Sequence, residues 1–466
     1  MRDPALRKAG MNNASLSHPA WWLAMAAVGL CALLIRWYYL SHAVVDHPVR
    51  GDAIQYYAYA WNLVHHGTFS MAPPGSAQVL PDSFRDPVYP AFLAIWMYAS
   101  ADASSWYWHV LASQGLLGAL TVVLLANAAR GWLPDRWLIA TGLLMAIWPH
   151  NVSINGYLLT ETLYGFLCAL AFVFLRLALR RASVGWMTAA GLAFGLAALT
   201  NAVLVPFAIL LAIYMAVRKL SPRRLTMTLA LSALLIPGCW SMRNMQLPAD
   251  ASSSGRALIN LVQGSRPDYH SSFRAMADGD PEGLRTYRAI QHEADVAAAN
   301  PREGLSRIGA RMAGAPVRYL RWYLSKPALL WDWGIRIGQG DIYVYPTYAS
   351  PFLRNPAFRI LASLCWALNP LVMVLALAGC ISLLWRGARK CPTSQAAALL
   401  LVYVTLVHSI LQAEPRYAIP YRGFEILVAG LGLHVIIHWL LRQRRGDTAP
   451  AARGSREDPG EATRGG

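Results

Sequence analysis

Residues 21–40, WWLAMAAVGLCALLIRWYYL, decide the fold because they form an almost unbroken apolar run. A bilayer core of roughly 30 Å is crossed by about 20 helical residues. Runs of similar length recur at 114–129, 361–385 and 418–441. Of all residues, 56% are hydrophobic and only 14% are charged, which excludes an ordinary soluble domain. The sequence therefore predicts an all-α polytopic membrane protein.

The charge of the chain also fits a membrane protein. The net charge is +17, but the basic residues stand in short clusters between the apolar runs. This is the positive-inside pattern and does not favour a nucleic-acid partner. The first run follows three basic residues and has no small-x-small cleavage site, so we expect a retained signal anchor. We expect the basic clusters and both termini on the cytoplasmic side of a bacterial inner membrane; the clusters lie at 130–136, 176–181, 218–224, 386–390 and 442–445.

Alternation of these clusters with the apolar runs predicts about ten spans, within a range of about 8 to 13. We expect them near residues 20–40, 105–129, 137–150, 157–179, 186–200, 202–217, 224–241, 360–385, 395–412 and 419–441. Residues 91–99 are too short to cross and are expected to form a re-entrant or interfacial helix.

Two long loops should face outward and carry amphipathic helices, among them 281–326. Because every expected cytoplasmic loop is short, we place the chemistry on the outer, periplasmic face. The six cysteines lie in expected spans or in a cytoplasmic loop and indicate no disulfide framework. The expected segments are a cytoplasmic N-terminus (1–19), a transmembrane module (20–241) with a first outward loop (41–103), an outward helical region (242–358), C-terminal spans (359–441) and a disordered cytoplasmic tail (442–466).

The first outward loop opens with a helix that starts at Asp52 and ends before Gly67. Tyr56 and Tyr59 follow Asp52 at helical spacing and form an aromatic side. Asp52 could be a plain N-cap. It could also be a carboxylate that takes a proton from an acceptor hydroxyl. The two roles are compatible, because a helix N-terminus favours the anion.

Residues 83–90, SFRDPVYP, supply the next candidates. The guanidinium of Arg85 can fork onto a phosphate, with Asp86 and Tyr89 beside it. The alternative for Arg85 is a local ion pair with Asp86.

Glu161 lies near the outer end of an expected span, where a carboxylate is costly unless it is paired or lines a polar cavity. It is therefore a functional candidate, and the alternative is a snorkelling interface residue. His150 lies in the turn before it and could join the same cavity.

Charges also crowd the expected outer rim between the last two spans, at Glu414, Arg416, Arg422 and Glu425, with Tyr417 beside Arg416. They could hold a lipid phosphate, or they could form a structural ion-pair cluster that closes the bundle. In the second loop, Lys326 ends a segment of mixed aromatic and basic residues. This segment could be a surface anchor, or Lys326 could contact the phosphate of a lipid carrier.

These motifs resemble a known family. Asp-x-x-x-Tyr-Tyr-x-x-Ala from Asp52, followed by Arg-x-Pro-x-Tyr-Pro from Arg85, resembles the first outer loop of the GT-C superfamily, nearest to the protein O-mannosyltransferase and lipid A aminoarabinose transferase group. The likeness recurs at 159–161 and 414–417. It implies that the loop carboxylate, here Asp52, is catalytic, with Glu161 as a second catalytic candidate. The family often has a second acidic residue where this chain has Ala53.

The resemblance implies a membrane glycosyltransferase, transferring a hexosyl or pentosyl group in an inverting single displacement. No nucleotide-binding motif is visible, so an outward-facing transferase is expected to use a polyprenyl-phosphate-linked sugar. The acceptor could be a glycan, a lipid or a protein. No cofactor is required by the sequence, although a divalent metal is possible. The alternatives are a transporter or flippase of lipid-linked saccharides, and a non-catalytic assembly subunit.

Overall fold

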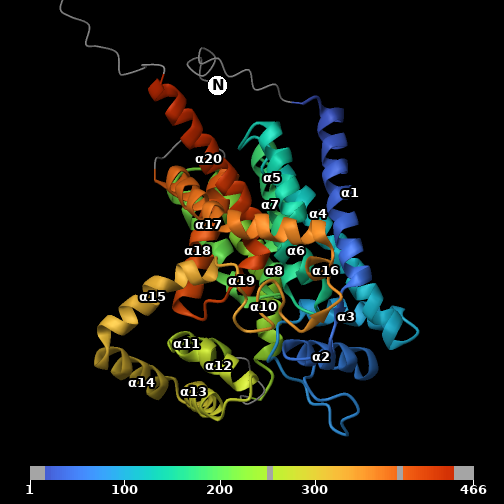
Figure 1. The fold of residues 1–466 in the computed structure, drawn as a ribbon, viewed down its shortest axis with the longest axis vertical. Helices are drawn as coiled ribbons and strands as arrows, with labels where there is room; N and C mark the ends of the chain where they lie inside the picture. The colour runs from blue at the N-terminus through green and yellow to red at the C-terminus, as the bar shows by residue number, and fades with distance from the viewer. Residues whose placement is uncertain (1–15, 249–254, 386–391, 445–466) are drawn as a thin grey trace, which may run out of the picture.

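The computed structural model describes residues 16–248, 255–385 and 392–444. Within them the regular structure is almost all helix (Figure 1). The one two-stranded sheet pairs β1 (Val44–Val45) antiparallel with β2 (Thr347–Tyr348), and so joins the two long loops. The expected cytoplasmic N-terminal segment lies mostly outside the described residues. The 386–390 basic cluster and nearly all of the expected disordered tail also lie outside them.

In the described chain, seven helices are long and apolar enough to cross a membrane. They are α1 (His18–His42), α4 (Ala103–Ala128), α7 (Glu161–Arg181), α10 (Arg223–Asn244), α17 (Pro356–Leu384), α18 (Pro392–Ile410) and the run Pro415–Leu441, which contains α19 (Pro415–Ala418), η6 (Ile419–Tyr421) and most of α20 (Arg422–Arg444). The prediction of an all-α, multi-pass membrane protein is confirmed.

The remaining expected spans are helical but shorter or broken. The pair α5 (Asp135–Ile147) and α6 (Pro149–Ser153) with η2 (Ile154–Gly156) bends by 57° and would make an eighth span. The bend lies at Pro149, because a proline forces the residue before it out of helical geometry. The shorter apolar helices are α3 (Val88–Ala99), α8 (Val184–Ala198) and η3 (Ala202–Leu204) continuing into α9 (Val205–Val217).

Glycines let the spanning helices approach closely. A Cβ at Gly432 of α20 would lie 2.2 Å from the backbone oxygen of Leu375 in α17, and one at Gly379 would lie 2.3 Å from that of Val428. Small residues at helix contacts allow such packing where lipid removes the hydrophobic driving force.

The long loops contain shorter helices. The first carries α2 (Asp52–His66), and its C-terminal Gly67 adopts φ 62°, as expected for a glycine after a helix end. The expected 281–326 helix is interrupted, because Pro301 and Pro316 each begin a new helix. The second loop and its exit contain α11 (Arg256–Gly264), α12 (Tyr269–Ala277), α13 (Pro281–Ala299), α14 (Pro301–Gly314), α15 (Pro316–Leu330) and α16 (Pro351–Arg354).

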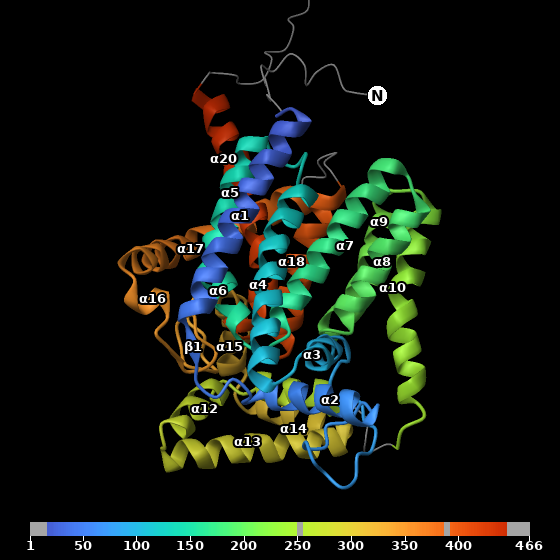
Figure 2. The same ribbon diagram turned by 90° about the vertical axis from the view of Figure 1, so that its right-hand side faces the viewer.

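Both long loops gather at one end of the bundle (Figures 1 and 2). Helix α2 and helices α11 to α14 lie at the end opposite the start of α1 and the end of α20. The basic turn between α4 and α5 lies beside the start of α1, since the Arg130 guanidinium is 4.6 Å from the centre of the Trp21 ring and Leu16 N donates to Asp135 Oδ2 at 2.8 Å. The loops and this basic turn thus lie at opposite ends.

This arrangement predicts opposite labelling of two exposed positions in a cysteine-free variant. Glu282→Cys, in α13, should react with a membrane-impermeant maleimide added outside intact cells. Arg218→Cys, at the exposed end of α9, should react only after the cells are permeabilised. Labelling of Arg218→Cys alone in intact cells would reverse the predicted orientation.

Candidate active site

A cavity of about 1340 Å³ lies where the two long loops meet the ends of the spanning helices. Its walls come from α2, the start of α7, α11, α12, α19 and residues 331–346, which we call the strap. Seven of the expected site residues line it: Asp52, Tyr56, Arg85, Asp86, Glu161, Arg416 and Tyr417.

Asp52 is the first residue of α2, but its side chain makes no capping hydrogen bond. Its Oδ1 accepts from Arg85 Nη2 at 2.7 Å, and its Oδ2 accepts from Arg416 Nη2 at 3.0 Å. The preceding Gly51 adopts φ 54°, where other residues are strained, and a Cβ there would lie 3.2 Å from the hydroxyl of Tyr345. The local backbone thus directs Asp52 toward two arginines, and the N-cap interpretation does not describe it.

Arg416 joins two carboxylates from different parts of the chain. While its Nη2 contacts Asp52, its Nε donates to Glu161 Oε1 at 2.5 Å. Glu161 is buried, so it is a paired residue and not a snorkelling one. Two carboxylates and two guanidiniums therefore stand together at the cavity wall with no net charge.

The arginines control the ionisation of Asp52. Burial alone would raise the pKa of this carboxyl, but Arg416 and Arg85 outweigh burial and hold its pKa well below the usual range. Asp52 is therefore an anion at neutral pH. It is also a weak proton acceptor for as long as both guanidiniums stay on it.

Arg85 is held from three sides. Besides Asp52, it donates to Gln55 Oε1 at 2.5 Å and to the Tyr56 hydroxyl at 3.4 Å. Tyr56 packs edge-on against Tyr89, with ring centres 5.2 Å apart, and Tyr89 donates to Gln114 at 2.9 Å. Tyr89 is wholly buried and supports Tyr56 from behind.

Asp86 does not pair with Arg85. Its Oδ2 lies 3.7 Å from Arg256 of α11 and accepts from Ala202 N at 3.3 Å. The alternative of a local Arg85–Asp86 pair is therefore not what the structure contains.

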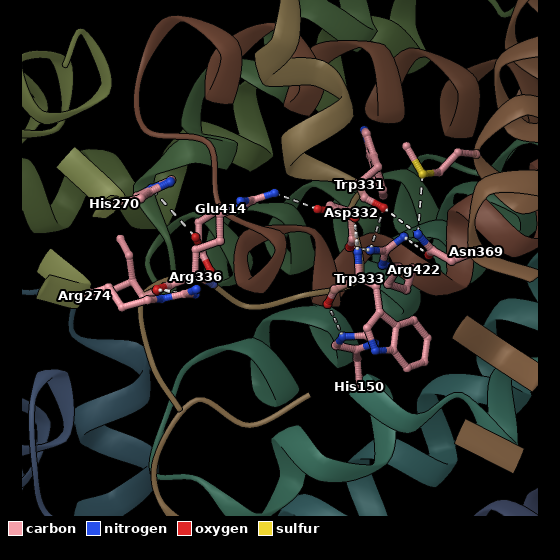
Figure 3. A network of polar contacts seen from close by, with 12 residues as sticks. His150, His270, Arg274, Trp331, Asp332, Trp333, Arg336, Asn369, Glu414 and Arg422 are labelled. Carbon is pink, nitrogen blue, oxygen red and sulfur yellow. Dashed lines mark hydrogen bonds and ion pairs between the residues drawn. The ribbon is translucent and has the colours of Figure 1, made fainter. Parts of the chain in front are cut away.

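Three other predicted site residues hold the strap and do not line the cavity (Figure 3). Arg422 donates to the backbone oxygens of Trp331 and Asp332 at 3.0 and 2.6 Å. The Nε2–H of His150 donates to Trp333 O at 2.8 Å. Glu414 Oε1 accepts from the backbone N–H of Arg336 at 2.6 Å. Each buried side chain thus fixes strap backbone at or beside residues that line the cavity, such as Asp332 and Arg336.

The predicted charge cluster of the last motif thus divides in two. Arg416 faces the cavity, whereas Arg422 is fully buried and pairs with Glu425 at 2.8 Å and with Asn369 at 3.1 Å. The interpretation of a structural ion pair describes Arg422, and the cavity interpretation describes Arg416.

Lys326 also lies away from the cavity. Its ammonium donates to Gly264 O at 2.9 Å and to Leu411 O, and so ties α15 to the ends of α11 and α18. Burial lowers the pKa of Lys326 to about 7.

Several lining residues had no signal in the sequence. Arg50, Gln55, Arg256, Arg274 and Arg336 all line the cavity. Gln55 stands at an unspecified position of the Asp52 motif, and the three arginines of the second loop come from segments with no recognisable motif, so only the three-dimensional fold brings them together.

The described residues include no group of three or more His, Cys, Asp or Glu that could hold a metal ion. Between Asp52 and Glu161, where two carboxylates could share a cation, the guanidinium of Arg416 already bridges them. The residues as arranged therefore do not fit a metal between these two carboxylates.

No known protein family and no curated protein matches this sequence. Among solved structures, the Archaeoglobus fulgidus oligosaccharyltransferase in complex with Zn and sulfate is similar, with a TM-score of 0.51 at 13% identity over 90% of this chain and 50% of that one. The chain thus spans about half the length of that protein. ArnT from Cupriavidus metallidurans, bound to undecaprenyl phosphate, gives a TM-score of 0.35 at 15% identity over 92% of this chain and 80% of that one. The first likeness shows that the chain has a GT-C-like fold.

The buried carboxyl of Glu414, which accepts from the strap backbone, predicts a stability that depends on pH. Burial raises the pKa of Glu414 from 4.5 to about 7, although the backbone N–H groups of Arg336 and Ile337 oppose this. The folded state then binds the proton more tightly than the unfolded state. Protonated Glu414 therefore contributes about 3 kcal/mol to the free energy of unfolding below about pH 4.5. This contribution is lost as the pH rises to about 7.

We therefore compare the melting temperatures of the wild type and Glu414→Gln in detergent. The wild-type value minus the variant value should decrease as the pH rises from 5 to 8. Glu282→Gln, which alters an exposed ion pair, is the control and should follow the wild type. A constant difference between wild type and Glu414→Gln over this range would contradict the raised pKa.

Proposed function

We propose that this protein is a membrane glycosyltransferase that moves a sugar from a polyprenyl-phosphate carrier to an acceptor hydroxyl on the outer face of a bacterial inner membrane. The observation that carries the proposal is the Arg416 bridge between Asp52 and Glu161, with Arg85 on the same carboxylate. The GT-C-like fold supports it, because the archaeal structure that shares this fold is an oligosaccharyltransferase.

The cavity suits two substrates at once. Ligand pockets for a single small molecule usually enclose roughly 300–1,000 Å³. The volume here, about 1340 Å³, leaves room for a sugar phosphate and for part of an acceptor. Its lining is rich in arginine, carboxylate and tyrosine side chains, which suit phosphate and sugar hydroxyls.

Arg85 and Arg416 are the proposed phosphate ligands. Both are planar forks that can bind two phosphate oxygens in parallel, and both are already oriented at the wall by fixed partners. As the sugar leaves, negative charge grows on the bridging phosphate oxygen. Two guanidiniums beside that oxygen would stabilise this charge more than the ground state.

Asp52 is the proposed general base. The acceptor hydroxyl gives its proton to Asp52 and attacks the anomeric carbon, while the bond from that carbon to the phosphate oxygen breaks. The polyprenyl phosphate leaves with the bonding electron pair. One displacement inverts the anomeric configuration, and no covalent enzyme intermediate forms.

The same arginines would couple the two substrates. When the donor phosphate draws Arg85 or Arg416 toward itself, the Asp52 carboxylate loses the partners that hold its pKa low. Its basicity then rises only in the donor complex. The donor is therefore expected to bind before the acceptor is deprotonated.

Other wall residues are given supporting roles in this proposal. Tyr56 and Tyr417 line the cavity as aromatic wall residues beside the proposed sugar site, and the Asp86–Arg256 pair contributes further charged groups to the same wall. Glu414, His150 and Arg422 act indirectly, by fixing the strap.

A transporter or flippase of lipid-linked saccharides would be expected to place its polar site near the bilayer midplane, between paired halves. Here many of the residues that line the cavity belong to α2, α11 and α12. These helices lie at the end of the bundle that carries the long loops (Figures 1 and 2). This position favours chemistry at a membrane surface.

Asp52→Asn should lower transfer by at least about 100-fold, because loss of a general base typically costs 10²–10⁴ in rate. Membranes with equal amounts of inserted protein are incubated with a panel of radiolabelled polyprenyl-phosphate sugars, and label is followed into protein, lipid and polysaccharide fractions. Asp46→Asn, in the same loop and outside the cavity lining, is the matched control. Wild-type transfer by the Asp52 variant would rule out this mechanism.

Arg85→Gln should raise the donor KM by about 10- to 100-fold, which corresponds to one charged hydrogen bond to phosphate. Arg85→Lys should recover part of the loss, since it keeps the charge and loses the fork. Arg302→Gln, on the exposed start of α14, is the control. An unchanged donor KM in Arg85→Gln would remove Arg85 from the phosphate site.

A further inference from the structure

A second, smaller cavity of about 40 Å³ lies among the helices behind Glu161. Residues of α1, α4, α6, η2 and α7 line it, and we call it the inner chamber. Glu161 borders both cavities: its Oε1 accepts from Arg416, whereas its Oε2 is buried and has no hydrogen-bond partner among the described residues.

Glu161 Oε2 is one of five such atoms around this chamber. The other four lining atoms that are buried and lack a partner within the described protein are Arg36 Nε, Asn151 Oδ1, Asn155 Oδ1 and Thr162 Oγ1. Buried polar groups in folded proteins are almost always hydrogen-bonded, so a group of five around one small space indicates a polar occupant.

The neighbouring contacts fix the orientation of two of these atoms. Arg36 donates from Nη1 to the backbone oxygens of Ala32 and Ala146 and from Nη2 to that of Asn151, which leaves Nε as its nitrogen without a partner among the described residues. Asn155 donates its Nδ2 to Asn151 O at 2.6 Å and to Val152 O, which leaves Oδ1. A Cβ built on Gly118 of α4 would lie 2.2 Å from Asn155 Oδ1 and 2.8 Å from Arg36 Nε, so both atoms face this glycine.

The mixture of donors and acceptors identifies the chemical class of the occupant. A bare cation would suit Glu161 and the two amide oxygens but would face the guanidinium of Arg36. An anion would suit Arg36 but would face the carboxylate of Glu161. Water both donates and accepts, and one water needs about 10–15 Å³ of such volume and 2–4 polar partners. The chamber, at about 40 Å³, has room for two or three.

We propose that the inner chamber is a built site for two or three ordered waters that link Arg36 of the first spanning helix to Glu161 Oε2. The waters satisfy one carboxylate oxygen while Arg416 holds the other. A continuous polar chain then runs from Arg36 through the waters, Glu161 and Arg416 to Asp52. In this chain Arg36 and Thr162 are positioning residues, a consequence that rests on the proposed function.

The direct test is hydroxyl-radical footprinting of the full-length protein in lipid nanodiscs, because a bound water activated in place oxidises the side chains beside it. Met145 lines the chamber and is 0% exposed. Met187 is also 0% exposed but does not line it, and it is the matched control. Met145 should be oxidised several-fold faster than Met187, and equal rates would overturn the proposal.

Two substitutions should remove this difference. Gly118→Ala places a methyl group against Asn155 Oδ1 and Arg36 Nε, and should reduce Met145 oxidation to the rate of Met187. Gly238→Ala, where a Cβ would meet nothing within 4 Å, should leave the difference unchanged.

If Gly118→Ala does not fold, Thr162→Val removes one lining hydroxyl without a change of shape. Its control is Thr141→Val, whose hydroxyl donates to its own helix. If Met145 is still oxidised at the wild-type rate in Gly118→Ala, or in Thr162→Val where Gly118→Ala does not fold, the proposal is overturned.

A monovalent cation is the competing occupant, and an experimental structure that shows ordered waters separates the two. Two or three densities at hydrogen-bond distance from Glu161 Oε2 and Arg36 Nε support the proposal. One density with oxygen ligands at metal distances, lost when choline replaces sodium, overturns it.

Thr162→Val should also lower the maximal transfer rate several-fold with an unchanged donor KM, and an unchanged rate would break the link to Asp52. Footprinting needs no activity, so it tests the chamber even if Asp52→Asn shows the proposed function to be wrong.

Discussion

The site depends on one guanidinium, that of Arg416, which contacts Asp52 and Glu161 at once. These three residues come from the last spanning run, the first outward loop and the start of α7. The bridge therefore fixes α2 against the bundle as well as setting the local charge. Removal of one partner from a buried ion pair usually costs about 3–5 kcal/mol. Arg416 and Glu161 are mostly buried, so the bridge is structural and electrostatic together.

The strap shows how buried charges can serve a site without touching it. Its residues form a large part of the cavity wall, yet it has almost no regular structure of its own. Several of its backbone polar groups are satisfied by Arg422, His150 and Glu414. Buried backbone groups need such partners, because unpaired polar groups away from water cost free energy. These contacts hold the first half of the strap against the helices.

The sequence predicts the membrane class and the helix at Asp52, and it selects Arg85, Glu161 and Arg416 as candidates that the structure places on one cavity, because hydropathy and local motifs carry these features. It does not predict which charges share a cavity. Glu414 and Arg422 stand near Arg416 in the chain but face the strap, since successive residues in short helical turns point in different directions. Arg256 and Arg336 enter the cavity from the second loop, where no motif marks them. Long-range contacts of this kind are fixed by tertiary packing alone.

The neutrality of the Asp52 cluster has a further physical consequence. In the proposed reaction, a donor phosphate would add negative charge to a wall where two carboxylates already balance two guanidiniums. The phosphate would compete for arginines that are already paired, and its binding energy would be reduced by the ion pairs that it breaks. Under the same proposal, Glu161 would keep Arg416 near the site during this exchange, because it accepts from Nε while the Nη atoms turn from Asp52 to phosphate. A second carboxylate on the same arginine would then allow Asp52 to be released without loss of the phosphate ligand.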